Sequence, residues 1–250
     1  MTEAPMIRTR VDGNVATVSF ANGRHNAMTE RMVVELHDAL VQLAGDDRIL
    51  VVVLTGEGRS FCPGADLAHV ASGRIDAPIE PRHYRAAVVL HETPQVTVAA
   101  INGACAGAGL TLAAACDLRV ASRSARFSVA FLDVGVAGDM GGAWTLPRLV
   151  GAGRARDLMF LPEKFDAQRA LEVGLVSRVF DDDRFRDEVG ALTTRLAAAS
   201  PAAMATLKEN LLAAERMGFA DYVDLETERH TRRMASPGGR SRFSARGGSS

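Results

Sequence analysis

Two glycine-rich segments hold the residues whose types and spacing could do chemistry. Gly64-Ala65-Asp66-Leu67 follows the apolar run at 49–54, and Gly107-Ala108-Gly109 follows the apolar run at 96–101. Each segment opens a predicted helix, so the N–H groups of its first turn lack intrahelical acceptors and lie at the positive end of the helix dipole. Two such N–H groups that converge would form an oxyanion hole. The same spacing is also typical of two tight turns between core elements, so both interpretations stay open.

Other common catalytic signatures are missing from the sequence. The histidines form no HExxH pair, the cysteines have no CxxC spacing, and no GxSxG motif or phosphate-binding lysine motif is present. The stretch from Gly103 to Gly109 is not GxGxxG in register. We therefore expect no metal site and no nucleotide cofactor, and we expect the histidines to be structural or solvated.

The elements that must position the two segments alternate between strands and helices. A turn at Asp12-Gly13-Asn14 predicts a β-hairpin over 6–20, and Thr29 is the expected N-cap of a helix through about Leu43. Further apolar runs and turn residues predict strands at 49–54, 96–101 and 118–121, and helices from Asp66, at 82–92 and at 109–116. This alternation predicts a layered α/β core.

The pattern changes near residue 200. We divide the chain into a core at 1–200, a purely helical region at 201–235 and a tail at 236–250. The tail is rich in Gly, Ser and Arg and has little apolar content, so we expect it to be disordered.

Composition limits the classes of binding partner and the cellular compartment that can be expected. The 250 residues carry a formal net charge of -1 and are 47% hydrophobic, which favours a folded core and gives no electrostatic case for nucleic acid. The uncharged stretch between Glu92 and Asp117 is long enough to cross a bilayer. It is mostly Ala, Gly and Thr and is interrupted by Pro94, so we predict a strand, a turn and a helix instead. Three cysteines and the lack of a secretory signal favour a soluble cytoplasmic protein without a membrane partner.

Several ordered motifs resemble those of the enoyl-CoA hydratase/isomerase (crotonase) family. They lie at 22–28, 58–67, 101–117, 127–151 and 167–179. The resemblance implies an α/β fold, a spiral of ββα units with a C-terminal helical trimerisation region, assembled as a homotrimer or a dimer of trimers. It also implies an acyl-CoA substrate whose thioester oxygen is held by the backbone N–H groups of Ala65 and Ala108. Coenzyme A would be part of that substrate, and no other cofactor is expected.

The chain departs from the family at its catalytic carboxylates. The two glutamate positions of the family's hydratases fall on Thr111 and Phe131, and neither side chain can replace a carboxylate as an acid or base near neutral pH. Asp139, eight residues after Phe131, matches the place where family isomerases and aromatic-ring dehalogenases carry a working aspartate. The stretch 126–151 looks most like the ring-epoxide and enoyl isomerases of phenylacetate breakdown. The alternative is that Asp139 is the N-cap of a helix starting near Gly141.

Other residues are expected at or near the site. Asp133 is the second candidate for the base, and Arg24 and His25 lie where relatives place basic residues near the CoA phosphates. Asp66 and Asp117 are expected to bond the backbone. The remaining expected contacts to the substrate or to CoA are Ala27, Gly64, Asp66, Leu67, Gly107, Thr111, Phe131 and Trp144.

These residues favour an enoyl-CoA isomerase in which Asp139 moves a proton and Phe131 keeps the pocket dry. Three alternatives stay open. They are a hydratase of the same family, an enzyme that uses Asp139 as a nucleophile on an activated ring, and a non-catalytic acyl-CoA binder.

Overall fold

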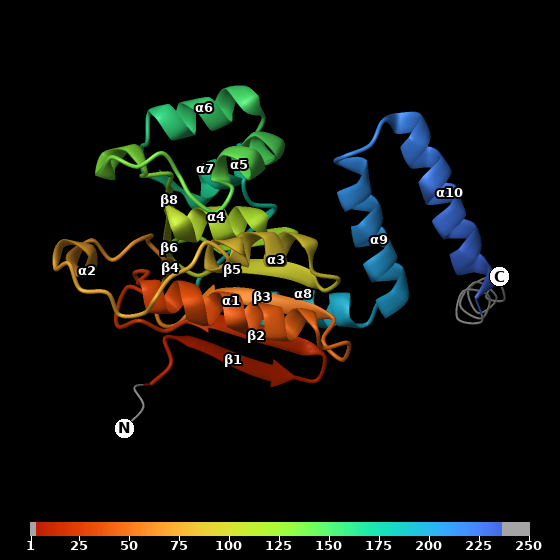
Figure 1. Cartoon of the computed structure of the whole chain (residues 1–250), viewed down its shortest axis with the longest axis horizontal. Coiled ribbons are helices and arrows are strands. Elements are labelled where there is room, and N and C mark those ends of the chain that lie inside the picture. The colour runs from red at the N-terminus through yellow and green to blue at the C-terminus, as the bar shows by residue number, and fades with distance from the viewer. Residues whose placement is uncertain (1–3, 237–250) are drawn as a thin grey trace. The chain divides into compact units, whose positions relative to one another are not determined.

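A succession of long strand, short strand and helix builds the centre of the chain (Figure 1). The computed structural model describes residues 4–236. The chain divides between Ala198 and Ala199 into two compact units. In the larger unit the successive ββα units are β3 (Val51–Gly56), β4 (Ser60–Cys62) and α2 (Leu67–Ala71); β5 (Val96–Ile101), β6 (Ala104–Ala106) and α4 (Ala108–Ala115); and β7 (Leu118–Ser122), β8 (Arg126–Ser128) and α5 (Gly142–Val150). The predicted α/β spiral of ββα units is confirmed.

The long strands form a six-stranded sheet that is covered on both faces. Its order is β1-β2-β3-β5-β7-β10, and the remaining strands are β1 (Ile7–Asp12), β2 (Val15–Phe20) and β10 (Arg178–Phe180). One face packs against α1 (Glu30–Ala44), α3 (Ala86–Glu92) and α4, and the other packs against α8 (Phe185–Ala197). Strands β2, β3, β5, β7 and β10 pair in parallel. Parallel strands buried on both faces read as continuous apolar runs, which is why the three central strands could be predicted.

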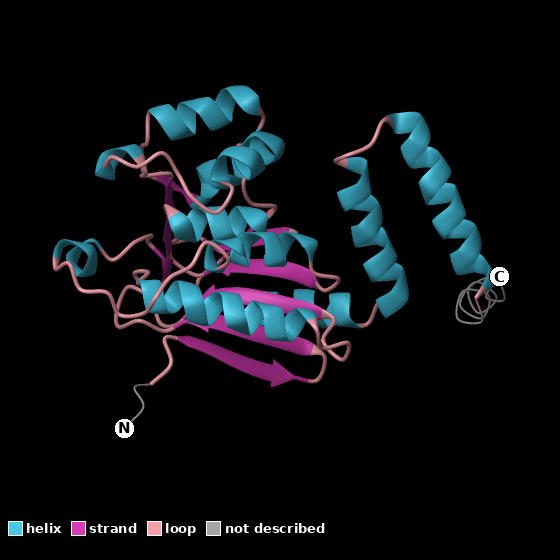
Figure 2. Ribbon diagram, viewed as in Figure 1, coloured by secondary structure: helices cyan, strands magenta, loops and turns pink. Residues whose placement is uncertain are grey.

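The short strands form a second sheet at one end of the long ones (Figure 2). Its order is β4-β6-β8-β9, with β9 at Phe165–Asp166. Strands β4 and β6 pair in parallel, with Cys62 opposite Cys105. The chain therefore leaves both strands at the same edge, so the two glycine-rich segments emerge side by side. The other helical elements of the larger unit are η1 (His83–Arg85), η2 (Leu132–Val134), α6 (Ala152–Phe160) and α7 (Ala167–Glu172).

The predictions made from local sequence patterns near the N-terminus are also confirmed. Strands β1 and β2 form the predicted hairpin, pairing from Ile7 with Phe20 to Asp12 with Val15. Thr29 caps α1, and its hydroxyl accepts a hydrogen bond from the Met32 N–H at 3.4 Å. The uncharged stretch forms β5, β6 and α4, and none of the helices within 4–236 has the length and apolarity needed to cross a membrane.

The smaller unit contains two helices, α9 (Pro201–Ala214) and α10 (Phe219–Ala235). Arg229 on α10 donates a hydrogen bond to the Asn210 Oδ1 of α9 at 2.8 Å, and Arg233 donates one to Ser200 at 3.0 Å. The predicted role of this region in trimer assembly stays a prediction. Apart from Ser236, the tail predicted to be disordered lies outside the described residues.

Candidate active site

The backbone around Ala65 is arranged so that its N–H faces away from its strand neighbour. Ala65 forms a parallel β-bridge with Met28, in which the Met28 N–H donates to the Gly64 carbonyl and the Asp66 N–H donates to the Met28 carbonyl, both at 2.8 Å. Since successive groups of an extended chain point to opposite sides, the Ala65 N–H points the other way. Within residues 4–236 it donates no recorded hydrogen bond. It is therefore available to a ligand.

Ala108 offers a second N–H of the same kind. It is the first residue of α4, so its N–H has no intrahelical acceptor. The preceding Gly107 has φ +49° and ψ -125°, a conformation that disfavours residues with a Cβ. A Cβ built on Gly107 would lie 3.6 Å from the Gly64 Cα. The two turns thus touch through their glycines, which places the Ala65 and Ala108 N–H groups on neighbouring backbone segments.

Asp139 contacts α4 directly. The Thr111 hydroxyl lies 3.2 Å from Asp139 Oδ1 and 2.9 Å from the Ala108 carbonyl, so its single proton can be donated to either acceptor. Burial raises the pKa of the Asp139 carboxyl above its ordinary value, and the Thr111 hydrogen bond lowers it in part. A half-buried carboxylate with a raised pKa is suited to act as a general base near neutral pH.

The capping alternative for Asp139 is wrong. The N-cap of α5 is Gly141, and no side chain caps this helix. Asp139 contributes only its backbone carbonyl, which accepts from the Gly142 N–H at 3.1 Å. The side chain is held away from the helix because the loop around it runs through left-handed conformations at Gly138 (φ +110°), Met140 (φ +43°) and Gly141 (φ +81°). Met140 is the non-glycine residue among them, and strained backbone of this kind is concentrated at functional sites.

One cavity brings the three candidate catalytic groups together. It has a volume of about 150 Å³, and Ala65, Ala108 and Asp139 all line it. Its other lining residues are Met28, Thr29, Glu30, Val33, His69, Val70, Ile79, Tyr84 and Met140. The site thus combines two backbone donors and the Asp139 carboxylate in a largely apolar wall that also holds Glu30 and His69.

Phe131 and Thr111 fill the space behind this cavity. Phe131 is buried, and its ring lies 4.0 Å from a Cβ built on Gly107 and 3.9 Å from one built on Gly138. It therefore packs between the turn before Ala108 and the loop that carries Asp139. Thr111 is fully buried, and a Cβ on Gly142 would lie 2.4 Å from its methyl group. Neither position has spare room for a longer side chain.

The other predicted residues fall into two groups. Asp66 is structural as expected, since its carboxylate caps α2 by accepting from the His69 N–H at 2.9 Å. Asp117 likewise accepts from the Thr97 N–H at 2.7 Å. Gly64 and Gly107 shape the two turns, and the Ala27 carbonyl accepts from the Asn22 side chain at 2.7 Å. Their predicted contacts with a substrate stay predictions.

The structure places the second group outside the cavity lining. Arg24 and His25 are exposed in the turn before Ala27. Trp144 packs its indole against the His91 ring, 5.2 Å between centroids, and under the Arg148 guanidinium. Leu67 and Asp133 are exposed and are not among the residues that line the cavity. Cys62 is buried, which raises the pKa of its thiol to about 12, so thiolate chemistry is excluded there.

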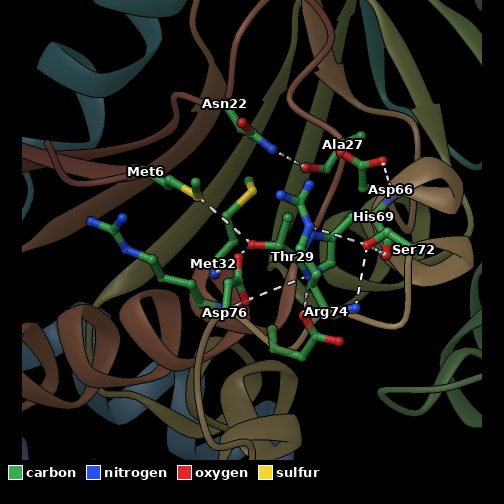
Figure 3. A network of polar contacts seen from close by, with 12 residues as sticks. Met6, Asn22, Ala27, Thr29, Met32, Asp66, His69, Ser72, Arg74 and Asp76 are labelled. Atoms are coloured by element: carbon green, nitrogen blue, oxygen red, sulfur yellow. Dashed lines mark hydrogen bonds and ion pairs between the residues drawn. The ribbon is translucent and has the colours of Figure 1, made fainter. Parts of the chain in front are cut away.

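Sequence reasoning missed a polar cluster on the cavity wall. His69 Nε2 lies 2.8 Å from Glu30 Oε2 and 3.9 Å from Asp76 Oδ1 (Figure 3). One ligand-type atom from each of these three residues lies within 4.8 Å of the others, although their spacing along the chain matches no metal motif. Burial acts to raise the pKa of Asp76, but hydrogen bonds from Thr29 and the Arg31 N–H hold it below its ordinary value. No local signal could have joined these residues, since three separate segments carry them.

The fold and the site define the class of protein. The model of the enoyl-CoA hydratase/isomerase family matches residues 10–244, and the chain belongs to this family. The chain is 33% identical over 239 residues to 4-chlorobenzoyl coenzyme A dehalogenase-2 of an Arthrobacter species, covering 93% of this chain and 85% of that protein. It is 35% identical over 215 residues to 1,2-epoxyphenylacetyl-CoA isomerase of Escherichia coli (strain K12), covering 82% and 80%.

Solved structures agree with this placement. A protein of Thermobifida fusca YX, classed with the enoyl-CoA hydratases and solved in complex with CoA, superposes with a TM-score of 0.87. Its sequence is 31% identical, and the match covers 92% of this chain and 93% of that one. The family is therefore established for the chain, and the relatives carry out more than one reaction.

Proposed function

We propose that this protein is an enoyl-CoA isomerase that moves a double bond of an acyl-CoA thioester into conjugation. The observation that carries the proposal is the single cavity shared by the carboxylate of Asp139 and the N–H groups of Ala65 and Ala108. Hydratases of the family need two carboxylates to activate water, and the corresponding positions are Thr111 and Phe131. A double-bond shift needs only one base.

The reaction follows from the placement of these groups. Asp139 removes the α-proton of a β,γ-enoyl-CoA, and the electrons of the broken C–H bond form a dienolate. The thioester oxygen, now negative, accepts hydrogen bonds from Ala65 and Ala108, which stabilises the charge as it develops. Protonated Asp139 then returns the proton to the γ-carbon, giving the α,β-enoyl-CoA. No atoms are gained or lost, and no water takes part.

Phe131 and the apolar lining support this chemistry by keeping water from the carboxylate. A drier site raises the pKa of Asp139 and strengthens it as a base. A carboxylate with an ordinary pKa is a weaker base and would accept the α-proton less readily. The direction of the pKa shift at Asp139 thus agrees with the role.

A second candidate uses Asp139 as a nucleophile. Two Arthrobacter dehalogenases are similar to the chain over 93% of its length, and Tyr84 lines the same cavity as Asp139. In this reaction the carboxylate would bond to a halogen-bearing ring carbon, halide would leave with its electron pair, and water would hydrolyse the resulting ester. We rank it second because the lining holds only the rings of Tyr84 and His69, whereas an aromatic substrate needs a cradle of several rings.

One panel of substrates separates these reactions. The protein is incubated with β,γ-hexenoyl-CoA, with its α,β isomer and with 4-chlorobenzoyl-CoA, while ultraviolet absorbance, product mass and chloride are followed. The proposal expects gain of conjugation without a change of mass. Added water would indicate a hydratase, and chloride release would indicate a dehalogenase. No change with any ester would leave only a binding role.

A further inference from the structure

The imidazole of His69 is held rigidly on the wall of the cavity. The backbone of His69 is fixed at its N–H and at its carbonyl. The N–H donates to the Asp66 carboxylate at 2.9 Å, and the carbonyl accepts from the Ser72 hydroxyl at 2.6 Å (Figure 3). The ring is fixed by Glu30, 2.8 Å from Nε2. Only 12% of the side chain is exposed. A histidine fixed at three points is arranged for a defined contact.

The other ring nitrogen, Nδ1, belongs to a side chain that lines the cavity. Carboxylates only accept hydrogen bonds, so Nε2 carries the proton that points to Glu30. Among the described residues, no hydrogen bond to His69 Nδ1 is recorded. Neutral imidazole would accept at Nδ1, and imidazolium would donate from it. A hydroxyl group pairs with either form, because it both donates and accepts.

His69 and Glu30 belong to a different wall from Asp139. Ala65 pairs with Met28, two residues before Glu30, and His69 follows Ala65 by four residues on α2. Asp139 is held by Thr111 on α4, beyond the touching turns. Because these residues line one cavity, an acyl group whose thioester oxygen meets Ala65 and Ala108 can contact both His69 and Asp139. The cavity has a volume of about 150 Å³, which favours a short acyl group.

We propose that His69, oriented by Glu30, is a specificity-determining residue that selects short acyl-CoA substrates carrying a hydroxyl group on the acyl chain. This rests on the proposed function only in that the cavity holds the acyl group. A hydrocarbon chain of the same length would displace water from Nδ1 and leave it unpaired. Sites built to bond a substrate hydroxyl discriminate strongly against analogues that lack it, for this reason.

Binding of unreactive esters tests the proposal without requiring turnover. Calorimetry compares hexanoyl-CoA with γ- and δ-hydroxypentanoyl-CoA, both of which have the same number of non-hydrogen atoms as hexanoyl-CoA. We expect the wild-type protein to bind one hydroxy ester roughly tenfold more tightly than hexanoyl-CoA. His69→Leu should abolish or invert that preference, and His69→Gln, which keeps a hydrogen-bonding side chain, should retain part of it.

His37→Leu is the matched control. The His37 side chain is 14% exposed and its Nδ1 lies 3.0 Å from a carboxylate of Asp38, yet it does not line the cavity. This variant should keep the wild-type preference. Equal affinities of the wild-type protein for all three esters would overturn the proposal, as would an unchanged preference in His69→Leu.

The outcomes separate the specificity from the reaction. A protein that isomerises β,γ-enoyl-CoA but does not prefer a hydroxy ester retains the proposed function and loses the role of His69. A protein that prefers the hydroxy ester but leaves every double bond in place retains the role of His69 and loses the proposed function.

Discussion

Replacing Thr111 with Val removes the one side-chain hydrogen bond recorded for Asp139 in the described chain while keeping the volume of the buried side chain. A hydrogen bond to a charged group typically contributes about 1.5–3 kcal/mol. This bond is 3.2 Å long and its proton is shared with the Ala108 carbonyl at 2.9 Å, so we take a smaller value of about 1 kcal/mol. That energy corresponds to a factor of about five in an equilibrium. Because the Thr111 bond favours the carboxylate, its loss raises the pKa of Asp139.

The assay is the pH dependence of kcat/KM for isomerisation of a β,γ-enoyl-CoA. A base must be deprotonated to act, so the acid limb of the profile should move to higher pH in Thr111→Val, with roughly fivefold lower activity on that limb and little change on the plateau. Thr111→Ser should restore the wild-type limb. Thr145→Val is the control, since the Thr145 hydroxyl contacts only carbonyls of Gly141 and Gly142. An acid limb that stays in place, or moves to lower pH, refutes the reasoning.

Three further predictions concern the same site. Thr111→Glu combined with Phe131→Glu should lower stability by roughly 2–5 kcal/mol, because a buried ring is lost and carboxylates enter packed space. Hydration of an α,β-enoyl-CoA should nevertheless rise above the wild-type level. Denaturation measures the loss of stability, and a mass assay measures the added water. Gly107→Ala should cost about 1–3 kcal/mol and at least tenfold in kcat/KM, since the strained turn positions the Ala108 N–H. Gly135→Ala, also at positive φ but with nothing within 4 Å of its Cβ, should cost stability without that loss of activity. Burial raises the folded-state pKa of Asp139, so the charged carboxylate destabilises the fold as pH rises through that pKa. Asp139→Asn should therefore have a higher melting temperature than wild type at neutral pH, but not below the ordinary carboxyl pKa. Thermal scans at both pH values test this.

The parts of the fold that could be predicted are those with a strong local signal. The Asp12-Gly13-Asn14 turn predicted the hairpin, and Thr29 predicted the start of α1. Continuous apolar runs predicted the central strands. The second sheet had no such signal, because its strands are only two or three residues long and cannot display an alternation. Its pairing nevertheless brings the two glycine-rich segments together.

The candidate site divides in the same way. The glycine turns after buried strands indicated where an oxyanion hole could form, but the assignment of Ala65, Ala108 and Asp139 followed from a family resemblance. The contact between Asp139 and Thr111 joins residues 28 positions apart, and that between His69 and Glu30 joins residues 39 apart. Such contacts depend on how α1, α2 and α4 pack, which no local pattern encodes. Trp144 packs against His91 and Arg148 and does not line the cavity, and its predicted contact with substrate or CoA stays a prediction.

The central claim is that Asp139 is the base of an isomerase. The most direct measurement compares wild-type and Asp139→Asn protein in single-turnover isomerisation of β,γ-hexenoyl-CoA, with hexanoyl-CoA affinity measured on the same samples. Asparagine keeps the size of the side chain and can still accept from Thr111, so the cavity should be preserved. The account predicts a rate lower by about 10²–10⁴-fold with affinity changed less than about threefold. A variant that isomerises at close to the wild-type rate would contradict it.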